Sequence, residues 1–153
     1  PPRSTLSSSS AASDVYKRQH ITKMQYYVTA CSNDAMQYAV LEAMEKASDY
    51  PAKMCQEFKT RRDLICDRLN AMEGVSCHVP TGAFYVFPKV DVPGMNSEEV
   101  AMALLQGGVL CSPGSAFGKA GEGHLRFAYT IGRDDISLGM DRVEKVLAEL
   151  RDN

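Results

Sequence analysis

The sequence predicts a small α/β domain in which one layer of helices packs against one sheet. Apolar residues recur at helical spacing in three long stretches, and short runs rich in aromatic and β-branched residues lie between them. The predicted order is helix, helix, two strands, helix, two strands and helix, without an internal repeat. At 153 residues the chain has the length of one domain and can form a buried core.

Two helices are predicted in the first half of the chain. The first follows a capping residue, Ser32 or Asn33, and the second begins at Tyr50, has Pro51 at its first position and ends at Gly74. The apolar face of the first helix consists of Met36, Val40, Leu41 and Met44. The apolar face of the second consists of Met54, Phe58, Ile65, Leu69 and Met72. We expect the methionines on these faces to pack in a core.

A β-hairpin is predicted directly after the second helix. Val75–Val79 alternates apolar and polar residues, Pro80–Gly82 has the composition of a turn, and Ala83–Phe87 is aromatic and β-branched. Two such runs separated by a short turn are typical of neighbouring antiparallel strands.

The second half of the chain predicts a short helix, two strands and a long helix. Asn96, with Glu99 three residues later, forms a capping-box pattern for a helix over Ser97–Gln106. The elements that follow are two short strands and an amphipathic helix, over Val109–Ser112, His124–Tyr129 and residues 134–151.

Composition argues against several classes of partner. The net charge is -2 without a large basic cluster, so we expect no nucleic acid partner. No apolar run approaches the roughly 20 residues of a membrane span, and the N-terminus has no secretory signal. The five cysteines are scattered without a C-x-x-C pair, which favours mostly buried, unpaired thiols over a disulfide framework or a zinc site. We therefore expect a cytoplasmic protein that does not associate with membranes.

The first 19 residues differ in composition from the rest of the chain. They are rich in serine, nearly devoid of large apolar residues and without a period. A transit peptide has a similar composition, but this stretch has no starting Met and no clear amphipathic face. We interpret residues 1–19 as a non-native or disordered tail and expect the folded part to begin at about His20.

Arg126 is the main candidate for a functional side chain. In the strand His124–Tyr129, Leu125 and Phe127 point to one face and Arg126 to the other. A guanidinium is always charged and matches a carboxylate with two parallel hydrogen bonds. The residues alone leave open an anion site, a solvent-facing arginine and a structural ion pair.

Three other candidates are weaker. Pro113–Gly118 is glycine-rich, but it lacks both the P-loop and the dinucleotide-binding pattern, so a tight loop is favoured over a phosphate cradle. His78 and His124 have no partner at metal-ligand spacing and are interpreted as ordinary strand residues. Ser115 lacks the context of a hydrolase nucleophile.

Three motifs in order resemble class I/II aminotransferases of the aspartate aminotransferase type. Pro80–Pro88 is similar to the family's P-x-G-A-F-Y-x-F-P hairpin, and the similarity continues through Gly108–Gly118 to Gly121–Tyr129. Upstream, Ile21–Gln25 and residues 32–44 resemble the stretch that closes the family's large domain. The resemblance extends over residues 20–151.

The resemblance implies a site and a reaction. By similarity, Arg126 binds the α-carboxylate of the substrate, Phe84 and Tyr85 lie on the substrate side of the small domain, and the Thr29–Asn33 loop lies near a dimer interface. The implied protein is a homodimeric transferase that uses pyridoxal 5'-phosphate to move an amino group between an L-amino acid and a 2-oxo acid. Related C–S lyases and aminocyclopropane-carboxylate-synthase-like enzymes remain as alternatives, as does a non-catalytic interaction domain.

The resemblance also implies that part of the enzyme lies outside this chain. No lysine has the surroundings of the family's Schiff-base motif, and Lys23 lies downstream of the expected place. We therefore expect no catalytic residue and no activity in this chain alone. The implied layout is the end of the large, cofactor-binding domain over residues 20–48 and a small C-terminal domain of fold type I over residues 49–153. In that small domain, helices pack on a mixed or antiparallel sheet, preceded by the last helix of the large domain.

Overall fold

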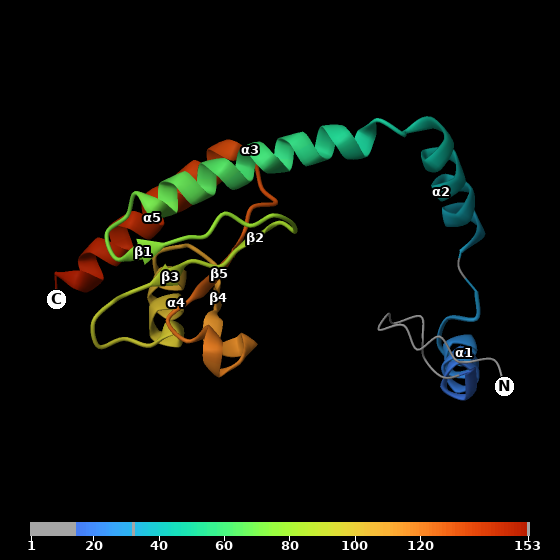
Figure 1. Cartoon of the computed structure of the whole chain (residues 1–153), viewed down its shortest axis with the longest axis horizontal. Coiled ribbons are helices and arrows are strands. Elements are labelled where there is room, and N and C mark those ends of the chain that lie inside the picture. The colour runs from blue at the N-terminus through green and yellow to red at the C-terminus, as the bar shows by residue number, and fades with distance from the viewer. Residues whose placement is uncertain (1–14, 32, 153) are drawn as a thin grey trace. The chain divides into compact units, whose positions relative to one another are not determined.

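The structure is a computed structural model, and it describes residues 15–31 and 33–152. The chain divides into two compact units, residues 1–48 and residues 49–153. Within the described residues, the first unit contains helices α1 (Val15–Thr29) and α2 (Asp34–Lys46), and the second contains the strands and the remaining α-helices (Figure 1).

Helix α1 differs from the sequence prediction, which placed a tail over residues 1–19 and no helix before residue 33. Residues 1–14 lie outside the described residues, but residues 15–19 belong to α1 rather than to an irregular tail. The helix escaped prediction because its first turns carry polar residues such as Lys17 and Arg18. After Val15 and Tyr16, the next large apolar residue is Ile21, so the apolar residues show no helical period.

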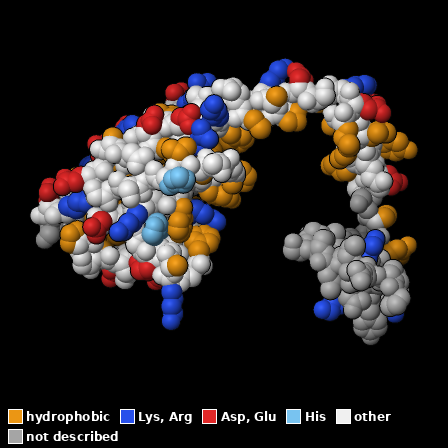
Figure 2. Space-filling model, in the orientation of Figure 1, with side chains coloured by type: hydrophobic (Ala, Val, Ile, Leu, Met, Phe, Trp, Pro, Cys, Tyr) orange, Lys and Arg blue, Asp and Glu red, His pale blue; other side chains and the backbone are white. Residues whose placement is uncertain are grey.

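Helix α2 begins at the predicted place but has no core. The side chain of Asn33 caps it, because the Met36 backbone N–H donates to Asn33 Oδ1 at 3.3 Å; the alternative cap, Ser32, lies outside the described residues. The prediction that Met36 and Met44 pack in a core is wrong within this chain, since they are 67% and 76% exposed. Figure 2 shows hydrophobic side chains exposed along α2. The amphipathic face is present, but nothing in the described residues of its own unit covers it.

In the second unit, the long helices α3 (Tyr50–Asn70) and α5 (Arg133–Arg151) lie side by side (Figure 1). Pro51 is at the start of α3 as predicted. The helix ends at Asn70 rather than at Gly74. Gly74 instead has a positive φ of 66° in the turn that leads into the first strand.

Across residues 15–31 and 33–152, five short strands form two antiparallel sheets. In one sheet, β1 (Val75–Ser76) pairs with β3 (Lys89–Val90). The other has the order β2-β5-β4, in which β5 (Leu125–Ala128) pairs with β2 (Tyr85–Val86) on one edge and with β4 (Ser112–Pro113) on the other. All pairs are antiparallel, so the predicted class of helices packed on a small sheet is confirmed.

The predicted hairpin between Val75–Val79 and Ala83–Phe87 is wrong, because each run pairs elsewhere. Beyond β1, the Asn70 side chain bonds both backbone groups of Cys77, with N···O distances of 2.8 and 3.0 Å, and so replaces the ladder. On the other side, Tyr129 donates from its hydroxyl to the carbonyl of residue 83 (2.9 Å) and from its N–H to the carbonyl of residue 84 (3.0 Å). These long-range bonds draw the second run to β5.

Helix α4 (Ser97–Gln106) confirms the predicted capping box. Asn96 Oδ1 accepts from the N–H groups of Glu98 and Glu99 at 3.0 Å each, and the Glu99 carboxylate accepts from Asn96 N–H at 2.8 Å. The Glu122 carboxylate accepts a further bond from Ser97 N–H at 2.6 Å. This backbone hydrogen bond is the main cause that lowers the pKa of Glu122. The start of α4 is thereby tied to the loop before β5.

The glycine-rich segment after β4 folds into two 3₁₀ turns, η2 (Gly114–Phe117) and η3 (Lys119–Gly121). The strand predicted at Val109–Ser112 is displaced to residues 112–113. Gly114 and Gly121 pack backbone to backbone, so that a Cβ on Gly114 would lie 1.9 Å from Gly121 O. The absence of a side chain therefore allows the two turns to pack together.

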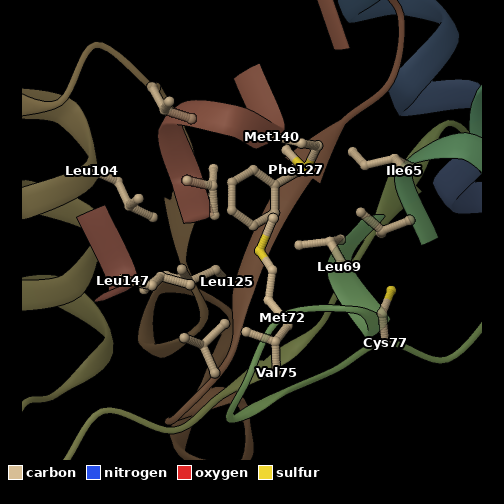
Figure 3. Packing of buried hydrophobic residues seen from close by; sticks show 14 of the residues in the cluster. Ile65, Leu69, Met72, Val75, Cys77, Leu104, Leu125, Phe127, Met140 and Leu147 are labelled. Atoms are coloured by element: carbon tan, nitrogen blue, oxygen red, sulfur yellow. The ribbon is translucent and has the colours of Figure 1, made fainter. Parts of the chain in front are cut away.

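The core joins three helices to both sheets (Figure 3). Leu69 of α3 and Leu104 of α4 are 0% exposed, and Leu125, Phe127 and Leu147 are 1%, 4% and 1% exposed. Burial of such a side chain stabilises a fold by about 1.5–3 kcal/mol. The inward face of β5 is therefore held against all three helices of this unit.

The cysteines are free, as predicted, but most of them are not buried. Cys66 and Cys77 are buried with their sulfurs 3.9 Å apart, Cys111 is half-buried, and Cys31 and Cys55 are exposed. Burial raises the pKa of Cys77 to about 12. Within the described residues, no helix is long and apolar enough to cross a membrane.

A pair of leucine substitutions tests where the core lies. Leu69→Ala should lower the free energy of unfolding by about 2–5 kcal/mol, because it removes a fully buried side chain. Leu41→Ala on α2 should change it by less than about 0.5 kcal/mol, since Leu41 is 53% exposed. Urea titration of the chain measures both. Equal losses would show that α2 packs in a core that the structure lacks.

The contact between η2 and η3 can be tested with glycine substitutions. Gly114→Ala should destabilise the fold by about 1–3 kcal/mol or more, because its Cβ meets backbone atoms that cannot rotate away. Gly82→Ala is the control, since nothing lies within 4 Å of a Cβ there. Thermal melting of the two variants at equal concentration gives the comparison. A Gly114→Ala variant as stable as the control would contradict the close approach.

Candidate substrate-carboxylate site

Arg126 lies in the middle of the central strand of its sheet. The alternation predicted from the sequence is present: Leu125 and Phe127 are buried, while Arg126 points to the opposite face and is half-buried. β5 lies between β2 and β4, so the guanidinium has a neighbouring strand on each side (Figure 1). Ser112 of β4 is its direct cross-strand partner.

Aromatic rings and a hydroxyl surround the guanidinium. The Arg126 Cζ lies 4.5 Å from the centroid of the Tyr85 ring and 4.6 Å from that of Phe117. One terminal nitrogen, Nη2, donates to Ser112 Oγ at 3.3 Å. These three neighbours are neutral, so they orient the cation without compensating its charge.

Arg126 differs in this respect from the other arginines of residues 49–152. Each of the other six bonds a carboxylate or a backbone carbonyl, or both: Arg61, Arg62, Arg68, Arg133, Arg142 and Arg151. Within the described residues, Arg126 has no ion pair, and its one hydrogen bond goes to a hydroxyl. A half-buried cation with free N–H donors is suited to bind an anion that enters from solution.

The two aromatic residues predicted beside Arg126 occupy different positions. Tyr85, at 37% exposure, contacts the guanidinium. The Phe84 ring lies 4.6 Å from the Tyr85 ring and 6.4 Å from Phe58 of α3. Phe84 also lines a surface hollow of about 400 Å³ beside α3, together with Tyr129. Tyr85 therefore contacts Arg126 directly, whereas Phe84 contacts Tyr85.

The glycine-rich segment forms tight turns, and the sequence had favoured such a loop over a phosphate cradle. Its N–H groups are used internally: Gly114 donates to the carbonyl of His124, Ser115 to the hydroxyl of Ser97, and Gly118 to the carbonyl of Ser115. An anion would have to displace these bonds. The segment instead carries Phe117 to the guanidinium of Arg126.

His124 makes an aromatic contact beside this site. His124 stacks on Phe87 with 5.1 Å between ring centroids and 9° between planes, and Phe87 meets Phe117 edge-on at 5.9 Å. Across the described residues, no group of three or more His, Cys, Asp or Glu side chains could hold a metal ion.

Two neighbours of Arg126 could not be predicted from the sequence, Ser112 and Phe117. Ser112 could have been found only from the register of β4 against β5, which is a long-range pairing. Phe117 lies in a segment whose recognisable feature is its glycines and not its aromatic residue. Neither residue has a local sequence signal.

The chain is similar to known aminotransferases. The family model for aminotransferase class I and II matches residues 6–143 of the chain. The chain is 39% identical to an aspartate aminotransferase of Pyrococcus abyssi over 134 residues, which is 86% of the chain and 34% of that protein. It is 37% identical to a probable N-acetyl-LL-diaminopimelate aminotransferase of Bacillus subtilis, over 93% of the chain and 36% of that protein.

Solved structures give the same result. An alanine aminotransferase from Pyrococcus furiosus matches 90% of the chain with a TM-score of 0.79 and 32% identity, over 35% of its own length. An aromatic aminotransferase from Pyrococcus horikoshii matches 86% of the chain with a TM-score of 0.78 and 36% identity, over 36% of its own length.

The chain therefore spans about a third of the length of the relatives it matches. Class I and II aminotransferases depend on pyridoxal 5'-phosphate, which is accordingly the cofactor of the full-length protein. Sequence, fold and the match over residues 6–143 lead to one assignment: the chain belongs to the class I and II aminotransferase family.

Proposed function

We propose that this chain is the C-terminal part of an aminotransferase subunit that moves an amino group between an L-amino acid and a 2-oxo acid. The proposal rests on Arg126, a half-buried guanidinium that contacts a hydroxyl and two aromatic rings and has no ion pair within the described residues. A carboxylate is common to both substrates of such a reaction, and a guanidinium fork fits it. The matched relatives differ in the amino acid that they are named for, so the proposal stops at the substrate class.

Arg126 contributes binding and orientation. When bound, pyridoxal phosphate supplies the electron sink for cleavage of the bond between Cα and its hydrogen. Two parallel hydrogen bonds from Arg126 to the substrate carboxylate would fix the rotation of the Cα substituents. Since Arg126 sits on a paired central strand, its position would change little as substrate enters. Tyr85, and more distantly Phe84, would border the substrate on this side.

This chain alone does not fit the cofactor. The amides of the glycine-rich segment are already used, and every lysine, including Lys23 in α1, is exposed. We therefore place the cofactor lysine and the phosphate-binding residues in an upstream part of the subunit. In this proposal residues 20–48 end the large domain and residues 49–153 form the small one, a layout supported by the boundary between the two compact units at residues 48 and 49.

The proposed assembly is a homodimer in the cytoplasm. The exposed apolar faces of α1 and α2 support additional contacts in a longer subunit. A transaminase is favoured over the related lyases, because the matched relatives described above are named as aminotransferases. The proposal includes no nucleic acid or membrane partner.

Replacement of Arg126 tests the carboxylate site. In the full-length subunit, Arg126→Lys should lower kcat/KM for every amino acid by roughly 10- to 100-fold, because lysine keeps the charge but loses the fork. Arg142→Lys is the control, since Arg142 belongs to α5 and donates to the backbone carbonyl of Gly108. Steady-state kinetics with a panel of amino donors and 2-oxoglutarate gives the values. Near-normal kcat/KM in Arg126→Lys would exclude the site.

The location of the cofactor lysine can be tested on the 153-residue chain itself. Incubation with pyridoxal phosphate and reduction with borohydride should label no single lysine preferentially, because all lysines are solvent-exposed surface amines. Peptide mapping by mass spectrometry measures the occupancy of each site. A single fully labelled lysine would show that the cofactor site lies within this chain.

A further inference from the structure

We propose that Tyr85 and Phe117 are positioning residues: they hold the Arg126 guanidinium between them and leave only its edge open, so that the site accepts a flat carboxylate approaching in the guanidinium plane. The inference rests on the proposed function. It assigns to Tyr85 a second role, which is to position Arg126, in addition to bordering the substrate. Phe117 and its supporting contacts have no counterpart in the sequence-based prediction.

The two rings reach Arg126 from opposite neighbours of its strand. Tyr85 belongs to β2, which pairs with one edge of β5, whereas Phe117 follows β4, which pairs with the other edge. Tyr85 is opposite Ala128 in the register, and thus on the same face of the sheet as Arg126. Both ring centroids lie within 4.6 Å of Cζ, close enough for a cation–π contact on each side.

Phe117 is itself held in place. Its ring meets Phe87 edge-on at 5.9 Å and 88°, and Phe87 stacks on His124 at 5.1 Å. The 3₁₀ turn that carries Phe117 is fixed by the close packing of Gly114 on Gly121. Although Phe117 is 52% exposed, its position is therefore determined by neighbours on two sides.

Tyr85 is supported in a corresponding way. The Phe84 ring lies 4.6 Å from it, and Phe84 rests near Phe58 of α3. The backbone at this point is fixed by Tyr129, whose N–H donates to the carbonyl of Phe84 at 3.0 Å. A continuous aromatic row thus runs from α3 to the guanidinium and onward to β5. Its members are Phe58, Phe84, Tyr85, Phe117, Phe87 and His124.

Ser112 alone would not hold the guanidinium. Its bond to Nη2 is long, at 3.3 Å, and a single hydrogen bond leaves rotation about that contact. A free arginine side chain loses considerable rotamer freedom on binding, and the rings remove that freedom beforehand. With one ring on each face, as proposed, the remaining N–H donors would lie at the edge, where the two oxygens of a carboxylate are matched.

The test uses the full-length enzyme with two donors, an amino acid and the amine made by removing its carboxyl group. Tyr85→Leu and Phe117→Leu should each lower kcat/KM for the amino acid by roughly 3- to 30-fold, mostly through KM, and should lower it by a smaller factor for the amine, so that the ratio between the two donors falls. Tyr85→Phe and Phe117→Tyr keep the ring and should retain the wild-type ratio between the two donors. Tyr50→Leu, at an exposed aromatic residue on α3, is the control.

The outcomes separate the inference from the function on which it rests. If the leucine variants lose kcat/KM by the same factor for both donors, the ratio between the donors is unchanged and the positioning role is overturned. An Arg126→Lys enzyme with an unchanged ratio would instead overturn the carboxylate site itself.

If the leucine variants fail to fold in the enzyme, the Nε–H resonance of Arg126 in the 153-residue chain gives a second readout. Ring currents should shift it upfield in wild type, Tyr85→Phe and Phe117→Tyr alike, and a resonance at the position of a free arginine in wild type would contradict the sandwich.

Discussion

Strand β5 is paired along both edges, and the candidate site depends on that pairing. Register against β2 places Tyr85 on the same face as Arg126, and register against β4 places Ser112 directly beside it. On the inner face, Leu125 and Phe127 are buried against the helices. A shift by one residue would exchange the two faces and bury the cation in the core, so the hydrophobic pattern and the site enforce the same register.

Arg126 is a half-buried cation without a counterion in the described part of the unit, and partial burial of an unpaired charge costs free energy. A half-buried guanidinium without a counterion is less favourable than a paired one, and the other arginines of the unit all have carboxylate or carbonyl partners. Two aromatic faces recover part of the loss without neutralising the cation. Such an arrangement keeps affinity available for an anionic ligand, which is the property that a substrate site requires.

The two units differ in whether they contain a buried core. Residues 49–153 bury the core residues of the sheets and of helices α3 to α5 within one body. Helix α2 has the amphipathic pattern of a packed helix and no buried residue. A chain that spans about a third of its relatives' length would be expected to contain faces whose partners lie elsewhere in a longer subunit.

The sequence by itself determined those features that depend on residues a few positions apart in the chain. The capping box of Asn96 and Glu99 sets the start of α4, and the alternation around Arg126 sets its outward direction, because each depends on residues a few positions apart. The tertiary structure decided the strand pairing, the contacts of Phe117 and the lack of a core for α2. The hairpin prediction was wrong because two side chains outside the paired runs bond backbone groups that a hairpin would have used. Asn70 bonds Cys77, seven residues later, and Tyr129 bonds Ala83, 46 residues earlier. Such side-chain to backbone bonds leave no period or motif in the chain, so they become evident only once it has folded.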